Sequence, residues 1–147
     1  KKIRNKHTAP FIDDFVIKPE YISEVLPLVT DVLKKHPEFI YTVAGHVGNG
    51  NFHIIPLVDI NNPNVRTAIP QISDEVYAII AKYKGSITGE HNDGLIRTPY
   101  LKTMYGEKIV KLFEETKNIF DPLNIFNPRK KVGGDLSYAM SHLRTSW

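Results

Sequence analysis

Residues 45–53 read Gly-His-Val-Gly-Asn-Gly-Asn-Phe-His and mark a sharp reversal of the chain. Three glycines within six positions exclude a stable helix, because each costs about 1 kcal/mol relative to alanine inside a helix. Asn49 and Gly50 are typical of a two-residue type I′ hairpin loop, in which both central residues need a positive φ. Closure of the loop at this dipeptide would place His46 opposite His53, with Cβ atoms about 5 Å apart. Two imidazoles at that spacing can share a metal ion, since zinc binds nitrogen at about 2.0–2.1 Å.

A second glycine-rich stretch follows at residues 88–94, which read Thr-Gly-Glu-His-Asn-Asp-Gly. Glu90 offers a carboxylate oxygen, and His91 places a titratable base directly beside it. Two opposed histidines on a hairpin are, by themselves, more typical of ordinary polar surface residues than of a metal site. The second stretch strengthens the metal-site hypothesis because it adds an acidic ligand.

Secondary-structure patterns on both sides of the hairpin indicate a small sheet with two helices. β-Branched and aromatic residues predict strands at 39–44 and 51–58, with a further short strand at 86–88. A strand is also expected over 11–18, although two aspartates interrupt its alternation. Helical spacing of apolar residues follows Pro19 as far as about His36, with Pro27 expected to kink or break it, and recurs over 65–83.

The resulting order β-α-β-β-α-β is the ferredoxin-like pattern of an α+β fold, an antiparallel sheet with helices on one face. Numbered in sequence order, the predicted strands are 1 (11–18), 2 (39–44), 3 (51–58) and 4 (86–88), and their usual spatial order is 4-1-3-2. In that order the end of strand 2, the start of strand 3 and the end of strand 4 meet at one edge. His46, His53 and Glu90 are therefore expected to converge there.

The C-terminal third predicts a helical extension to this fold. A helix is expected over 99–118, which Gly106 weakens and divides, and a loop follows at 120–128. Four large apolar side chains in that loop should pack against other parts of the protein. Residues 132–147 form a weakly patterned tail.

Composition bounds the class of protein. A chain of 147 residues with 41% hydrophobic and 24% charged residues suits one soluble domain. The net charge of +3 is spread along the sequence, which argues against a nucleic-acid interface. The absence of cysteine excludes disulfides, thiolate metal sites and a cysteine nucleophile. No run approaches the roughly 20 apolar residues of a membrane helix. We therefore expect a protein that is not transmembrane, located in the cytoplasm or peripherally at a membrane.

Three motifs together closely resemble the C-terminal domain of FAD-linked oxidases, a family that includes D-lactate dehydrogenase, the glycolate oxidase flavin subunit and D-2-hydroxyglutarate dehydrogenase. These are residues 45–53, residues 89–94, and the element from Phe-Asp-Pro at 120–122 to Asn-Pro at 127–128. The resemblance implies a cap and substrate domain over residues 1–131, with 132–147 as a C-terminal tail. It further implies that FAD is bound mainly by another domain of the same gene product. The chain shows no glycine-rich phosphate-binding motif and begins with Lys1, so we expect a fragment that lacks the N-terminal FAD-binding domain.

The resemblance also implies roles for residues of the two glycine-rich stretches. His46, His53 and Glu90 match the ligands of a divalent metal, usually zinc, in the metal-dependent members of the family. His91 matches the general base.

Three positions outside these stretches match elements that contact substrate or flavin. Arg4 and Thr8 resemble the pair that holds the substrate carboxylate, and Asn127 falls in an asparagine-proline element close to the flavin. Two positions depart from the common pattern: Asn49 replaces an aspartate, and Asn92 replaces a glycine. Neither is an expected ligand, but Asn92 bears on the backbone conformation beside His91.

The activity implied is oxidation of a D-2-hydroxy acid of the lactate, glycolate or 2-hydroxyglutarate type to the 2-oxo acid, with hydride transfer to flavin. Its partners would be the small substrate, the FAD-binding domain and an electron acceptor. Two alternatives remain open at this stage. One is a non-catalytic metal-binding module of the same fold that works without flavin. The other is a metal-dependent hydrolase, in which His91 or Glu90 activates metal-bound water.

Overall fold

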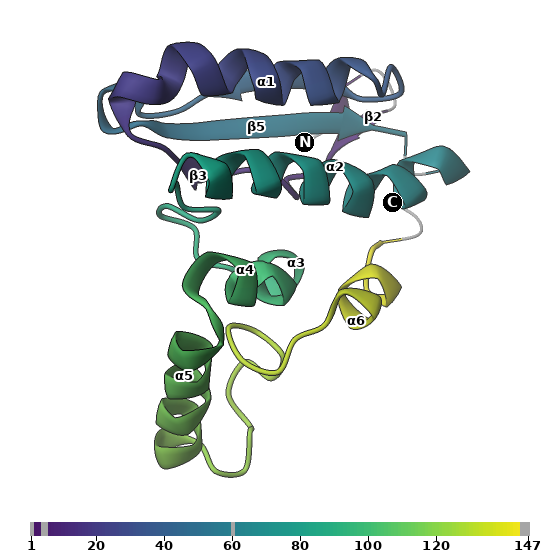
Figure 1. Ribbon diagram of the computed structural model, residues 1–147. Coiled ribbons are helices and arrows are strands. Elements are labelled where there is room, and N and C mark those ends of the chain that lie inside the picture. The colour runs from purple at the N-terminus through teal and green to yellow at the C-terminus, as the bar shows by residue number, and fades with distance from the viewer. Residues whose placement is uncertain (1, 4–5, 60, 145–147) are drawn as a thin grey trace. The chain divides into compact units, whose positions relative to one another are not determined.

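The computed structural model describes residues 2–3, 6–59 and 61–144. The chain divides into two compact units, one formed by Lys1–His91 with Arg144–Trp147 and the other by Asn92–Leu143. The first unit holds the sheet and two long helices, and the second is helical. This combination of helices with a small antiparallel sheet confirms the α+β class (Figure 1).

The sheet is built around one long strand, β5. Its strands are β1 (Lys2–Ile3), β2 (Lys6–Thr8), β3 (Phe15–Val16), β4 (Ile40–Ala44) and β5 (Asn51–Val58). All pairs are antiparallel: β4 follows one edge of β5, while β2 and β3 pair with its other edge. At the position expected for a fourth strand, Ser86 makes an isolated antiparallel bridge to Val16. The spatial order is therefore Ser86, β3, β5, β4. This is the order 4-1-3-2 that was expected for the four predicted strands.

Two helices cover one face of this sheet. They are α1 (Ile22–Lys34), which follows the short 3-10 helix η1 (Pro19–Tyr21), and α2 (Pro63–Lys82). Both run alongside β5 in Figure 1, and they contact each other. Pro27 lies inside α1, yet the helix continues through it, so the expected break is absent.

Alternation along β5 separates a covered face from an open face. Phe52, Ile54 and Val58 are buried, whereas His53, Ile55 and Leu57 on the opposite face are half-buried. On the covered face the Phe52 ring stacks on Phe15 at 5.6 Å between centroids. Full burial of an aromatic or branched side chain contributes about 1.5–3 kcal/mol. The core therefore fixes the register of β5, and that register presents His53 on the open face.

The connection between β4 and β5 differs from the predicted type I′ hairpin. Ala44 pairs with His53, so the two strands are joined by a longer loop that includes the 3-10 helix η2 (Val47–Asn49). Gly50 follows with φ 71°, and a Cβ there would lie 1.7 Å from the Ile17 carbonyl oxygen. This close approach of backbones, which only glycine permits, sets the loop geometry. His46 consequently lies in the loop and not directly opposite His53.

The strand expected over 11–18 is reduced to β3 because the chain leaves the sheet at two aspartates. From Thr8 to Phe15 the chain advances seven residues, while β5 advances five between their partners, Phe52 and Leu57. The two surplus residues form a bulge, a feature that re-aims side chains. Within it Asp14 is fully buried and adopts φ 72°, a conformation that costs a non-glycine residue about 1–2 kcal/mol.

The second unit consists of short helices and loops. Its elements are α3 (Gly94–Arg97), the 3-10 helix η3 (Thr98–Tyr100), α4 (Leu101–Tyr105), α5 (Glu107–Phe120) and α6 (Leu136–Ser141). Gly106, with φ 77°, separates α4 from α5, which confirms that it divides the predicted helix. The tail also contains α6, whose N-terminus is capped by the Asp135 side chain accepting from the backbone N–H of Tyr138.

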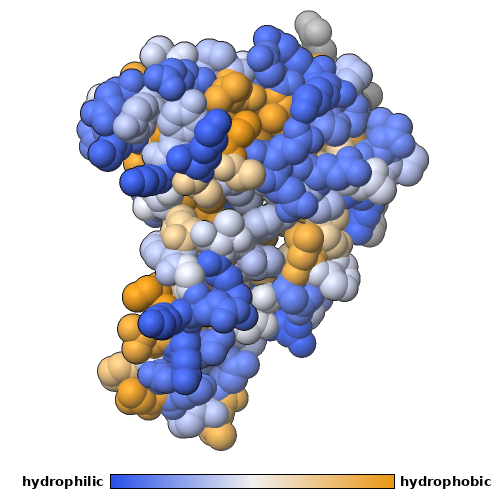
Figure 2. All heavy atoms as spheres, in the orientation of Figure 1, coloured by the Kyte–Doolittle hydropathy of each residue, from blue (hydrophilic) through white to orange (hydrophobic). Residues whose placement is uncertain are grey.

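An apolar patch extends from the end of α5 into the following loop. Its five members are each 64–81% exposed: Ile119, Phe120, Leu123, Ile125 and Phe126. Figure 2 shows apolar side chains gathered over this end of α5. The loop is held by Asp121, whose carboxylate accepts from two backbone N–H groups and pairs with Lys117. The loop side chains were expected to be packed, but among the described residues they remain exposed. None of the helices described is long and apolar enough to cross a membrane.

Candidate metal and catalytic site

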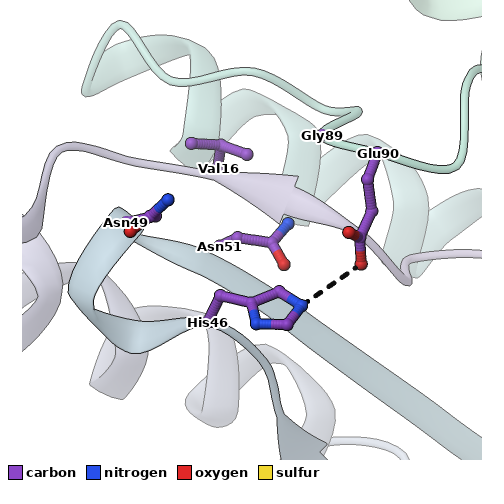
Figure 3. Close-up of a pocket in the computed structure, with 6 residues that line it drawn as sticks. All are labelled: Val16, His46, Asn49, Asn51, Gly89 and Glu90. Atoms are coloured by element: carbon purple, nitrogen blue, oxygen red, sulfur yellow. Dashed lines mark ion pairs between the residues drawn. The ribbon is translucent and has the colours of Figure 1, made fainter.

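Three histidine side chains converge on one carboxylate oxygen at the open face of the sheet. Glu90 Oε1 lies 3.0 Å from Nε2 of His53. It lies 3.5 Å from Nε2 of His46, the pair marked by the dashed line in Figure 3. The same oxygen lies 3.5 Å from Nε2 of His91. His53 comes from β5, His46 from the loop that precedes it, and the other two from the segment after Ser86. The predicted convergence of distant segments is therefore present in the structure.

His53 and His91 form a matched pair of imidazoles. Their rings are nearly parallel, with an interplanar angle of 16° and centroids 4.9 Å apart. Asp13 faces both rings: its Oδ1 lies 3.0 Å from His53 Nδ1, and its Oδ2 lies 3.4 Å from His91 Nδ1. The Asp13 side chain is 10% exposed, whereas that of His91 is 46% exposed. One carboxylate thus lies behind two imidazoles, of which that of His91 is the more exposed to solvent.

Asp14 organises the backbone that carries Glu90 and His91. Its Oδ2 accepts from the N–H groups of Gly89 and His91 at 2.9 and 2.7 Å, and its Oδ1 accepts from Glu90 N–H at 3.1 Å and Asn51 Nδ2 at 3.0 Å. Burial raises the pKa of this carboxyl, but hydrogen bonds from the three backbone N–H groups and Asn51 outweigh it and lower the pKa to about 2. Asp14 is therefore ionised at neutral pH.

The four hydrogen bonds also decide whether Asp14 can be a metal ligand. One of its oxygens lies within 4.8 Å of donor atoms of His53, Glu90 and His91, a spacing suited to a shared cation. A carboxylate has about four lone-pair directions, and four donors already occupy those of Asp14. Asp14 therefore supports the site from behind and leaves coordination to its neighbours.

A pocket adjoins the histidine cluster. It has a volume of about 330 Å³ and is lined by Val16, His46, Asn49, Asn51, Gly89 and Glu90 (Figure 3). The amide of Asn51 is buried and donates to Asp14, while its Oδ1 has no hydrogen-bond partner in the described part of the chain. A buried oxygen without a partner is costly unless a ligand, ion or water satisfies it.

The donor set fits a divalent cation. Imidazole nitrogen and carboxylate oxygen both bind zinc at about 2.0–2.2 Å, and ligand atoms of a tetrahedral site lie about 3.3 Å apart. The separations of 3.0 and 3.5 Å from Glu90 Oε1 to His53 and His46 bracket that value. The unpartnered oxygen of Asn51 adds a further acceptor beside the same pocket.

The remaining candidate residues are Thr8, Asn127 and Arg4. Thr8 is in β2 opposite Leu57, on the same face as His53 but four residues further along β5, which corresponds to roughly 13 Å. Asn127 belongs to the second unit, where it is exposed and adopts φ 47°. Arg4 lies outside the residues that the structure describes.

Sequence reasoning missed three residues of the site: Asp13, Asp14 and Asn51. The signal for the aspartates was present, because two charged residues interrupted the alternation of an otherwise apolar strand. Asn51 gave no comparable signal, since asparagine after glycine is ordinary loop chemistry. Asn92 takes φ 62°, so it adopts the left-handed conformation that the usual glycine would adopt.

Comparison with known proteins agrees with these motifs. The family model described as "FAD linked oxidases, C-terminal domain" matches residues 2–131. The D-2-hydroxyglutarate dehydrogenase of Pantoea ananatis is 35% identical over 82% of this chain and 12% of its own length. The glycolate oxidase subunit GlcD of Bacillus subtilis is 30% identical over 84% of this chain and 26% of its length. The D-lactate dehydrogenase of Anaerostipes hadrus is 32% identical over 80% of this chain and 25% of its length. The chain thus spans about a quarter or less of these relatives.

Proposed function

The chain belongs to the family of FAD-linked oxidase C-terminal domains, and from this we propose that it forms the substrate-binding and catalytic part of an FAD-dependent oxidoreductase. The substrate would be a D-2-hydroxy acid, oxidised to the 2-oxo acid. Relatives named as dehydrogenases of 2-hydroxyglutarate and lactate support this class, as does the relative named as a glycolate oxidase subunit. FAD would be held mainly by another domain of the same gene product, and an external acceptor would reoxidise it.

The observation that carries the proposal is the convergence of imidazole nitrogens on one oxygen of Glu90. His46, His53 and Glu90 would hold a divalent cation, and zinc suits two nitrogens and one oxygen best. When bound, the cation supplies a Lewis acid that lowers the pKa of the substrate hydroxyl, and FAD supplies the hydride acceptor. Three protein ligands leave a coordination position free for substrate.

His91 is the proposed general base. Its ring is half exposed, so a substrate hydroxyl can reach Nε2, and that atom lies 3.5 Å from the proposed ligand Glu90. A neutral imidazole accepts a proton efficiently near neutral pH because the ordinary pKa of histidine is about 6.5. His91 is therefore placed to take the hydroxyl proton beside the metal ligands.

Substrate orientation is proposed to come from Arg4 and Thr8, which would bind the carboxylate. Arginine suits this task because its guanidinium grips a carboxylate with two parallel hydrogen bonds. Thr8 shares the open face of the sheet with His53, which supports this assignment. Asn127 is proposed to approach the flavin.

Metal analysis tests the metal site. The full-length enzyme that contains this domain should hold one zinc, manganese or iron ion per chain, and a His46→Ala/His53→Ala double variant should lose it. His142→Ala is the matched control, because that histidine is exposed and contacts Tyr138 and Ser141, neither of which is a proposed ligand. Equal metal content in all three proteins would refute the assigned ligands.

Flavin reduction tests the catalytic assignment. With D-2-hydroxy acids as substrates, His91→Ala should abolish anaerobic bleaching of the flavin while FAD stays bound at wild-type stoichiometry. Normal reduction in this variant would remove His91 from the mechanism. Metal binding without any substrate-dependent flavin reduction in the wild type would favour a non-catalytic metal-binding module.

A further inference from the structure

The buried carboxylate behind the histidine pair has a role beyond the proposed ligands and base. Asp13 is 7% exposed and directs one oxygen to each ring, 3.0 Å from Nδ1 of His53 and 3.4 Å from Nδ1 of His91. We infer that Asp13 is a positioning residue that sets the tautomer and orientation of both imidazoles, the proposed metal ligand and the proposed base. This inference rests on the proposed function.

The chemistry of the contact fixes the proton positions. An ionised carboxylate can only accept hydrogen bonds, so the ring nitrogen that faces it carries the hydrogen. With hydrogen on Nδ1, each neutral ring presents the lone pair of Nε2 on its opposite side. That lone pair is needed in both rings, in His53 to bind a cation and in His91 to accept a proton.

The Nε2 atoms of both rings face the same atom, Glu90 Oε1. The two rings are stacked within 16° of parallel, and their Nε2 atoms lie 3.0 and 3.5 Å from Glu90 Oε1. A carboxylate behind the imidazole is the usual outer-shell partner of a metal-binding histidine. Here one such group serves two rings, so the ligand and the base are oriented together.

Asp14, the neighbouring carboxylate in the same bulge, has a structural role. Asp14 accepts three backbone N–H groups and the Asn51 amide, and its contacts hold the Gly89–His91 segment. Asp13 contacts the ring nitrogens of the two histidines. Substitution of Asp14 is therefore expected to affect the backbone of this segment, and substitution of Asp13 to affect the two rings.

Asp13→Asn in the full-length holoenzyme tests this inference. The amide oxygen can accept from one ring, but the amide N–H₂ faces the other ring and favours the tautomer with hydrogen on Nε2. We expect the zinc dissociation constant, measured by chelator competition with zinc alone, to rise about 10–100-fold. With zinc and substrate saturating, the rate of flavin reduction should fall about tenfold or more.

Two further measurements separate positioning from folding. FAD content and the unfolding midpoint in chelator should match the wild type in Asp13→Asn, whereas Asp14→Asn should lower the midpoint. Zinc affinity and flavin reduction within about twofold of wild type in Asp13→Asn would overturn the inference and leave the proposed function standing. A lowered midpoint equal to that of Asp14→Asn would also overturn it, because Asp13 would then be structural. Absence of zinc binding and of flavin reduction in the wild type would refute the proposed function together with the inference.

Discussion

Replacing Asp14 by asparagine should destabilise the 147-residue chain, because this carboxylate is the buried hub of four hydrogen bonds. Asparagine keeps one acceptor oxygen and turns an N–H₂ group toward two of the four donors. A buried donor without an acceptor costs about 1–3 kcal/mol. The segment Gly89–His91 borders solvent, so the lower half of the summed range applies. We expect a loss of about 2–4 kcal/mol at neutral pH.

The loss should also depend on pH. The pKa of Asp14 is lowered from 3.8 to about 2 in the folded protein, so its ionised form stabilises the fold. This contribution is fully present above about pH 4 and is lost as the pH falls toward 2. A shift of this size corresponds to about 2 kcal/mol. The stability difference between wild type and Asp14→Asn should therefore shrink by that amount across this range.

Urea unfolding followed by far-UV circular dichroism measures both effects. Titrations of wild type and variant at several pH values between about 7 and 2 give the difference in unfolding free energy at each pH. Asp13→Asn is the matched control, since it makes the same chemical change one residue away. A difference that stays constant with pH, or an equal loss in both variants, would refute the assignment of Asp14 as the hub.

Three further outcomes follow from the packing and the site. Gly50→Ala should lower the unfolding free energy by more than about 2 kcal/mol, because it combines a positive φ with a backbone clash. Gly48→Ala has open space at its Cβ and should change it by no more than about 0.5 kcal/mol in the same urea assay. Phe52→Ala should cost about 3–5 kcal/mol and Phe120→Ala less than about 0.5 kcal/mol, since the first is 2% and the second 81% exposed; equal losses would contradict the exposure of the apolar patch. Zinc at about 100 times its dissociation constant should raise the unfolding free energy by about 2.7 kcal/mol, and His53→Ala should abolish that increase in a thermal-shift titration.

The general architecture was predictable because it depends on repeated local patterns. β-Branched and aromatic residues predicted β5 with its observed bounds, and helical spacing over 65–83 predicted α2 to within two residues at its N-terminus. The order of these elements then predicted that His46, His53 and Glu90 would meet. Sheet topology, and not the hairpin type, brought them together.

The predictions that were wrong concern features that depend on contacts between distant parts of the chain. The loop at Gly50 is shaped by the approach of the Ile17 carbonyl, which the dipeptide Asn-Gly does not encode. The shortened strand β3 likewise reflects the backbone N–H groups of Gly89–His91, which draw Asp14 out of the sheet. Charged residues inside an apolar strand can mark such a site, but their partners are identified only by tertiary structure.

The two-residue surplus between Thr8 and Phe15 has an evolutionary consequence. Deleting Asp13 and Asp14 would match the length of this segment to that of β5, but it would remove the carboxylates that contact the two rings and the Gly89–His91 backbone. A descendant released from selection for chemistry therefore has a short mutational route to a more regular sheet. Conversely, retention of the surplus in a divergent homologue indicates that selection for the site persists, even where the histidines themselves have changed.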